Sequence, residues 1–261
     1  MYIHSTYKFI NKNENASYYK KLLKEVSSIN LRRSNKFDII SVYGACKCLE
    51  NINNYSKDLN IYIASKHGVI SGVLKILESF EASDNIIMPF DFLNMNGNNA
   101  GFNISQALNT NGESMLINTN DFPFEQSIKY AFSKSKNNHL FEAIVGGVDE
   151  SLSNIPNYQE YLINKSDTSY DGSSWLYLNN NRQNAIAKIE EIIEFISQKE
   201  LNNYLKNNLN FEVIYSTSIA ELTYATQNSS NLIDTLNSKQ KFIYITKYND
   251  SHYFIIKIIN C

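Results

Sequence analysis

The sequence has few cysteines, and they are irregularly spaced. Its 261 residues include only three: Cys46, Cys48 and Cys261. An odd number without regular spacing argues against a disulfide framework and fits the reducing cytoplasm. Cys46 and Cys48 provide too few ligands for zinc. We therefore expect no disulfide, no metal and no cofactor.

Long apolar runs and a large net charge are also missing. No stretch approaches roughly 18 uninterrupted apolar residues, so no transmembrane helix is expected. The start, Met1 to Ser5, lacks the basic and apolar pattern of a signal peptide. The formal net charge of −2 gives no broad attraction to nucleic acid or to an anionic membrane. These absences favour a cytoplasmic protein that binds neither.

The chain does contain alternating strand-like and helix-like segments. Hydrophobic residues make up 43% of it, which is enough for the core of one large domain. Such alternation predicts an α/β fold with a mixed β-sheet flanked by helices. The sequence shows no internal repeat. The clearest strand-like runs are 60–65, 115–119 and 143–148, and the clearest helical ones are 37–48, 69–80 and 122–134.

The last third of the chain, residues 179–261, is harder to interpret. Isoleucines recur there at spacings of three and four, which predicts a helix; they are Ile186, Ile189, Ile193 and Ile196. Residues 242–247 and 252–259 are expected to form two strands of a hairpin. We treat 1–261 as a single domain. In it, residues 179–261 are an extension that completes the sheet, replaces part of a missing half, or forms a cap.

One region resembles the surroundings of a catalytic nucleophile in a known family. Met115 to Thr119 reads as a strand, residues 122–134 read as a helix, and Ala143 to Glu150 reads as a buried strand with the sequence AIVGGVDE. Strand, sharp turn, helix and GGVDE strand follow in this order in β-ketoacyl synthases. At a strand end, Asp149 and Glu150 are expected to be solvated.

Further motifs carry the same resemblance, in the same order as in that family. Leu31 to Asp38 resembles "RRMSRFD", and Ile61 to Gly72 resembles the strand and glycine turn that follow it. Asn94 to Gly101 resembles "NSVHNAAAG", and Gly112 to Ser114 resembles the "GPS" turn. The resemblance covers about Leu31 to Leu178. It implies the N-terminal half of a thiolase-like fold.

The chain departs from the family at the residues of catalysis. Alignment on Gly112 places Asp121 where the family has its nucleophilic cysteine, and a carboxylate cannot form an acyl thioester. With Pro123 in the first turn, Asp121 is instead expected to cap the helix. The family's two histidine motifs are also missing around the four histidines, which are His4, His67, His139 and His252. The resemblance therefore implies a chain that does not condense anything by itself.

Chain-length factors resemble ketosynthases, lack the active cysteine and pair with a catalytic ketosynthase. Short ketosynthase-like proteins occur in aryl polyene pathways. The resemblance thus implies a heterodimer for polyene, polyketide or fatty-acid-like biosynthesis. Its expected interface strand is Met115, Leu116, Ile117, Asn118 and Thr119. An unpaired edge strand needs such covering.

Other side chains are candidates for contacts with an acyl group or its carrier. Phe122 and Phe124 are candidates for lining an acyl tunnel, although helical spacing also fits an ordinary core. Arg32 and Arg33 are candidates for contacting an acidic acyl carrier protein.

Two other functions stay open. The chain is alternatively a divergent acyltransferase or acyl-thioester-processing enzyme of the same fold. It is otherwise an unrelated α/β binding protein, in which case no sharp turn is expected between Thr119 and Phe124.

Overall fold

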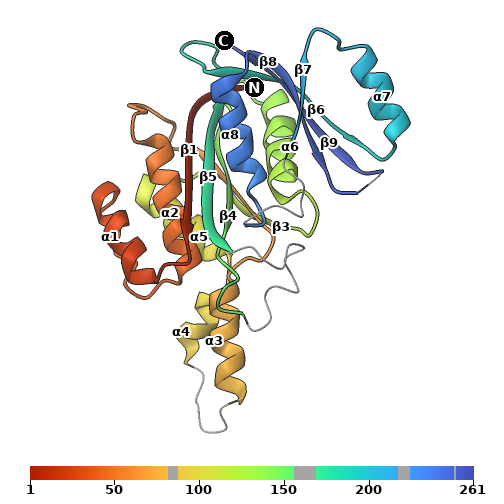
Figure 1. Ribbon diagram of the computed structural model, residues 1–261. Coiled ribbons are helices and arrows are strands. Elements are labelled where there is room, and N and C mark those ends of the chain that lie inside the picture. The colour runs from red at the N-terminus through yellow and green to blue at the C-terminus, as the bar shows by residue number, and fades with distance from the viewer. Residues whose placement is uncertain (82–87, 156–168, 217–223, 250) are drawn as a thin grey trace.

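The computed structural model describes residues 1–81, 88–155, 169–216, 224–249 and 251–261. The strands of these ranges form one nine-stranded sheet in the order β3-β2-β4-β5-β1-β6-β9-β8-β7, with helices on both of its faces (Figure 1). The predicted α/β fold with a mixed sheet flanked by helices is confirmed.

The first five strands form one end of the sheet. They are β1 (Tyr2–Lys12), β2 (Asn60–Ser65), β3 (Ser114–Asn118), β4 (Glu142–Asp149) and β5 (Tyr170–Asn179). β2 runs parallel to β3 and to β4, whereas β5 runs antiparallel to β4 and to β1. β3 therefore lies at the edge of the sheet.

The last four strands repeat this topology in shortened form. They are β6 (Ala187–Phe195), β7 (Glu212–Tyr215), β8 (Lys241–Lys247) and β9 (Tyr253–Asn260). β9 is antiparallel to β6 and β8, and β7 is parallel to β8. β6, β7, β8 and β9 thus correspond to β1, β2, β4 and β5, and the described residues show no counterpart of β3. The C-terminal segment is a reduced second half, a repeat of topology that the sequence does not reveal.

The helices arrange these two halves in layers. They are α1 (Ala16–Val26), α2 (Lys36–Leu49), α3 (Ile70–Glu81), α4 (Pro89–Asn94), α5 (Asn98–Leu108), α6 (Pro123–Lys136), α7 (Gln198–Lys206) and α8 (Asn228–Ser238). One core joins α1, α2 and α5 to the first half, and another joins α7 to the second half. The central core joins α6 and α8 to strands of both halves. These two helices therefore lie between the two halves of the sheet.

Alternate residues of the central strands contribute to different cores. In β2, Ile61 and Ile63 belong to the core with α2, whereas Tyr62 and Ala64 belong to the central core. Because both faces are buried, the strand reads as an almost continuous apolar run. The same holds for the buried strand β4, which the sequence predicts correctly.

The predicted helix at Ile186 to Ile196 is wrong, because residues 187–195 form strand β6. β6 pairs antiparallel with β9, which places Ile193 opposite Ile255. The pairing register shifts between Ile189 and Glu191, and such a bulge breaks strand alternation. The resulting spacing of isoleucines imitates a helix, although β-branched side chains favour strands.

The two glycines of the GGVDE strand permit close packing rather than an unusual backbone. A Cβ on Gly146 would lie 2.3 Å from the Trp175 indole, and one on Gly147 would lie 2.6 Å from Ser229 Oγ. Trp175 is fully buried on β5. Gly146 and Gly147 thus let β4 lie against β5 and α8.

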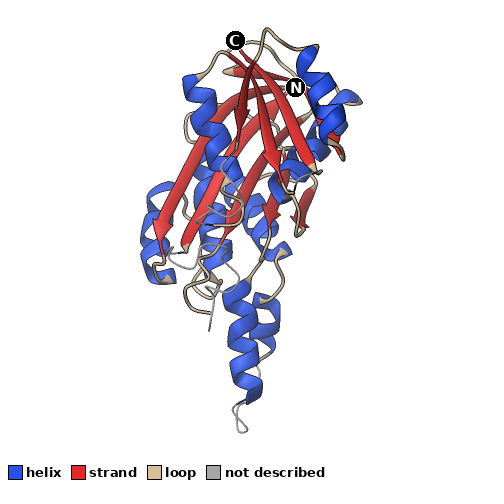
Figure 2. Cartoon of the chain, turned by 45° about the vertical axis from the view of Figure 1, so that its right-hand side comes forward, coloured by secondary structure: helices blue, strands red, loops and turns tan. Residues whose placement is uncertain are grey.

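Helices α3 and α4 project from the body of the molecule as a stalk (Figures 1 and 2). Only Gly72 and Ile76 of α3 are buried, and no residue of α4 is. We call α3 and α4 together the stalk.

Candidate functional site

The connection from β3 to α6 is a strained elbow. Phe122 lies between them with φ 51° and ψ 45°, and Pro123 begins the helix. A large side chain in this left-handed region costs on the order of 1–3 kcal/mol, so such strain persists only where the surrounding structure imposes it. The sharp turn expected between Thr119 and Phe124 is present. This argues against an accidental resemblance.

Asp121 does not cap α6, so that prediction is wrong. The N-cap position is Phe122, and no side chain caps the helix. The left-handed backbone at Phe122 turns the chain one residue later than expected. Asp121 Oδ1 instead accepts a hydrogen bond from Asn120 Nδ2 at 3.1 Å. A hydrogen bond with Asp121 also raises the pKa of the Tyr248 hydroxyl.

The side chain of Phe122 packs against the second half of the fold. Its ring centroid lies 4.8 Å from that of His252 and 5.7 Å from that of Phe254. Phe122 and Phe124 are both buried, belong to the central core and line the pocket described below. Their role in lining an acyl tunnel stays a prediction.

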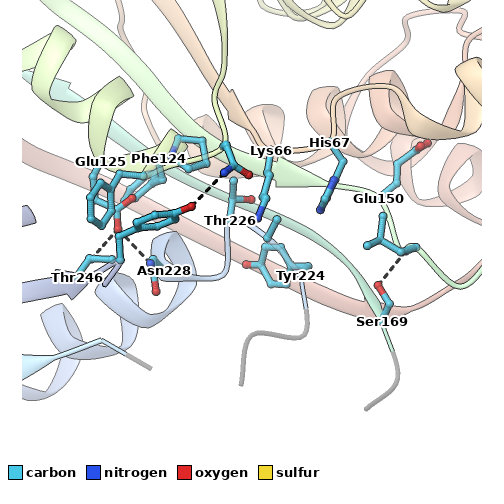
Figure 3. Close-up of a pocket in the computed structure, with 16 residues that line it drawn as sticks. Lys66, His67, Phe124, Glu125, Glu150, Ser169, Tyr224, Thr226, Asn228 and Thr246 are labelled. Carbon is cyan, nitrogen blue, oxygen red and sulfur yellow. Dashed lines mark hydrogen bonds between the residues drawn. The ribbon is translucent and has the colours of Figure 1, made fainter. Parts of the chain in front are cut away.

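A pocket of about 160 Å³ opens in front of this elbow (Figure 3). The first half contributes Lys66 and His67 from the turn after β2, and the elbow itself. The second half contributes residues around the start of α8, such as Thr226, and Tyr248 after β8. The pocket therefore lies between the two halves, and no short sequence motif contains it.

Asp149 holds the turn that brings Lys66 and His67 to this pocket. Its Oδ1 accepts hydrogen bonds from Ser65 Oγ at 2.6 Å, from the Lys66 backbone N–H at 3.0 Å and from the His67 backbone N–H at 3.1 Å. The carboxyl is fully buried. Burial raises the pKa of Asp149, and the charge of His67 and these hydrogen bonds oppose that shift.

Glu150 anchors the beginning of α3. Its Oε2 accepts from the Ser71 backbone N–H at 2.9 Å, and its Oε1 accepts from Ser71 Oγ at 2.8 Å. Burial raises the pKa of Glu150, against the hydrogen bonds and the charge of Lys36. Asp149 and Glu150 are 0% and 1% exposed, so the expectation that they are solvated is wrong.

Two histidines approach the elbow although neither has the family's sequence neighbours. His67 lines the pocket, and burial lowers the pKa of its imidazole, an effect that Asp149 opposes and Lys66 reinforces. His252 lies outside the pocket lining and pairs with Glu194 at 2.7 Å. His67 lies in the turn that follows the predicted strand 60–65, where the sequence offers it as a possible site residue. Contacts across the two halves place His252 beside Phe122, and no local pattern predicts that position.

None of the cysteines lines the pocket. Cys46 and Cys48 are buried in α2, and Cys261 is exposed at the end of the chain. Burial raises the pKa of the Cys46 thiol to about 11 and that of Cys48 to about 12, which keeps both protonated and unreactive. The pocket therefore has no thiol for an acyl-enzyme.

Among the described residues, no group of three or more acids, histidines and cysteines is placed to hold a metal ion. In the same ranges, no helix is both long and apolar enough to cross a membrane.

The predicted interface residues lie at the edge of the sheet. Met115, Leu116, Ile117 and Asn118 belong to β3, and Thr119 follows it. Within the part of the chain that the structure describes, the strand pairs with β2 alone, and it is half-buried to exposed. Its pairing with another chain stays a prediction.

No protein-family model matches the chain, and no curated protein matches it. Solved structures do. A chain of the complex of the ketosynthase ApeO with its chain length factor ApeC from Xenorhabdus doucetiae is 14% identical, with a TM-score of 0.60 over 97% of this chain and 99% of that one. The ishigamide ketosynthase/chain length factor is 6% identical, with a TM-score of 0.70 over 91% and 84%.

A third similar structure is the type II polyketide synthase complex AntDE:AntF, an acyl-carrier protein with its ketosynthase. It is 12% identical, with a TM-score of 0.68 over 100% of this chain and 99% of that one. The chain has the thiolase-like fold of ketosynthases and chain length factors. At these identities the likeness establishes the fold alone. Within that thiolase-like fold the strained elbow is present and a thiol in the adjoining pocket is not.

Replacing Asp149 by Ala is expected to lower the free energy of unfolding by roughly 2–4 kcal/mol, because three donors lose their acceptor in a buried place. Urea denaturation measures this loss. The control is Asp58→Ala at an exposed position, which should change stability by less than about 0.5 kcal/mol. Equal effects of the two substitutions would contradict the anchoring role of Asp149.

Asp38, at the start of α2, should make stability fall as the pH rises. Burial raises its pKa to about 7, the Asn35 hydrogen bond opposes the shift and the charge of Glu150 adds to it. Between about pH 4 and pH 7 the folded state therefore binds a proton that the unfolded state has lost. Stability attributable to Asp38 falls by up to about 1.4 kcal/mol per pH unit there.

Urea denaturation at pH 5 and pH 7 tests this for the unchanged protein and for Asp38→Asn. The variant should lose less stability between the two pH values than the unchanged protein does. Identical losses would show that Asp38 is ionised in the folded state at pH 5.

Proposed function

We propose that this protein is a cytoplasmic, non-catalytic subunit of the chain-length-factor type. It pairs with a catalytic β-ketoacyl synthase in polyene, polyketide or fatty-acid-like biosynthesis. One observation carries the proposal. The elbow that would present a nucleophile is formed by Asp121 and Phe122, and all three cysteines lie outside its pocket. Condensation requires an acyl thioester that these residues cannot form.

Exposed apolar side chains on the stalk support pairing with a partner. Seven apolar side chains on and beside the stalk are 36–65% exposed; they are Val73, Leu77, Phe80, Met88, Phe90, Phe92 and Leu93. An apolar cluster of this kind on a protein surface marks an interaction site. A partner with an apolar surface would bury these side chains.

The stalk continues into the edge strand. Gly97 follows α4, and a Cβ on it would lie 2.3 Å from Leu116 Cδ2 of β3. Ser114 of β3 likewise lies against Gly101 of α5, next to Phe102, which is 62% exposed. The segment after the stalk thus packs against the edge strand β3. A ketosynthase partner would cover both the stalk and β3, pairing with the strand and burying the apolar side chains.

In such a complex this subunit has a steric task. Phe122 and Phe124 fill the space beside the elbow with rigid aromatic rings, which are buried to 4% and 1% exposure. A packed wall of this kind does not expand cheaply around an added methylene. The subunit would therefore end the space available to the partner's growing acyl chain.

The substitution Leu77→Glu tests the surface, because Leu77 is 53% exposed and a buried carboxylate at an apolar interface is costly. Co-expression with ketosynthases encoded nearby, followed by native mass measurement, should give a one-to-one complex. Leu77→Glu should weaken it at least roughly tenfold. The matched control is Leu140→Glu, which changes an 89% exposed leucine elsewhere. A monomer or homodimer that forms no complex with any of these ketosynthases would contradict the proposal.

The substitution Asp121→Ala separates a supporting role from a catalytic one. In the assembled complex it should leave condensation turnover within about twofold, because no covalent bond to the acyl group forms at this carboxylate. The readout is product formed from acyl-thioester substrates, with the complex verified by native mass. Loss of turnover in an intact complex would favour the acyl-thioester-processing enzyme instead. Turnover or a covalent adduct with the isolated chain would do the same.

A further inference from the structure

The pocket in front of the elbow carries a positive charge that the described residues do not neutralise. Lys66 lines the pocket and its side chain is half-buried. Its backbone N–H donates a hydrogen bond to Asp149, and within the described ranges no ion pair includes its amine. In Figure 3 the side chains of Lys66 and His67 extend toward the space shared with Thr226 and Tyr224.

The carboxyl groups that line the pocket are already engaged. Both oxygens of Glu150 accept hydrogen bonds from Ser71. Glu125 Oε1 accepts from Thr246 Oγ1 at 2.6 Å and from Asn228 Nδ2 at 3.2 Å. Both acids are buried, and burial raises the pKa of each. Their oxygens already accept hydrogen bonds from the protein, whereas the amine of Lys66 has no ion-pair partner among the described residues.

His67 adds a polar group next to this charge. Burial holds the pKa of its imidazole below the ordinary value, so at neutral pH the ring is uncharged and offers one N–H donor and one acceptor nitrogen. The backbone of the same turn is fixed by Asp149, which orients both side chains before any ligand arrives. A preorganised amine and imidazole suit a carboxylate.

The remaining wall is partly apolar and the space is small. Phe122, Phe124, Leu152 and Ala225 line it. The volume of about 160 Å³ is smaller than the roughly 300–1,000 Å³ of pockets for drug-sized ligands. This suits an acid with a short hydrocarbon tail.

We propose that this pocket is a binding site for a short-chain carboxylate, which pairs with the amine of Lys66 and receives a hydrogen bond from His67. The hydrocarbon tail lies against the aromatic wall of the elbow. The site needs no thiol, and binding at it involves no covalent step. It belongs to the isolated chain and does not depend on pairing with a ketosynthase.

Titration calorimetry of the isolated chain with acetate, propionate, butyrate and succinate at constant ionic strength tests the proposal. At least one acid should bind saturably, and butyramide, which has no charge, should not. Lys66→Met should weaken the binding roughly tenfold or more, since hydrogen bonds to charged groups are the strong ones. The control is Lys24→Met, an exposed lysine on α1 that should leave the affinity unchanged.

Reductive methylation, read by peptide mass mapping, tests the same site without a substitution. The bound acid should slow labelling of Lys66 and leave that of Lys24 unchanged. This second measurement keeps the proposal testable if Lys66→Met fails to fold. The absence of saturable binding of every acid would overturn the proposal, as would binding that neither protects Lys66 nor weakens in the variant. Neither result bears on whether the chain pairs with a ketosynthase.

Discussion

The buried acid pair at the end of β4 is the constraint on which the site depends. Asp149 fixes the turn after β2 and Glu150 fixes the start of α3, so one strand end positions both the pocket residues and the stalk. Two adjacent buried carboxyls are tolerated because each accepts hydrogen bonds, Asp149 through Oδ1 and Glu150 through both oxygens. The same end of β4 thus holds in place both the pocket turn and the first residues of the stalk.

A central layer of two helices joins the two halves of the fold. α6 and α8 fill the layer between the two halves, and their shared core contains side chains from both. Among the described residues, β7 is the edge strand of the second half, and its Ile214 packs against this shared core. The chain contains the central layer and the elbow. What it does not carry in the pocket is the reactive sulfur.

Sequence reasoning succeeded where a signal is local and failed where it is not. Strands buried on both faces, such as β2 and β4, are continuous apolar runs, and the elbow follows from strand, turn and helix in order. β1 was missed because its half-buried residues mix polar and apolar types. β6 was misread because of its bulge. The pocket joins Lys66 to Thr226 across 160 positions, and no local pattern encodes that.

The pairing of β1 has a consequence for how the chain is made. β1 begins at Tyr2, yet its main partner is β5, whose register joins Tyr2 to Asn179. β1 leaves a ribosome long before β5 does, so its place in the sheet exists only after the chain as far as Asn179 has been synthesised. Until then its backbone groups are open to other chains. Non-local pairing of this kind makes folding slow. β1 is thus synthesised early but joins the sheet late. During that interval it is the strand that a chaperone would have to protect.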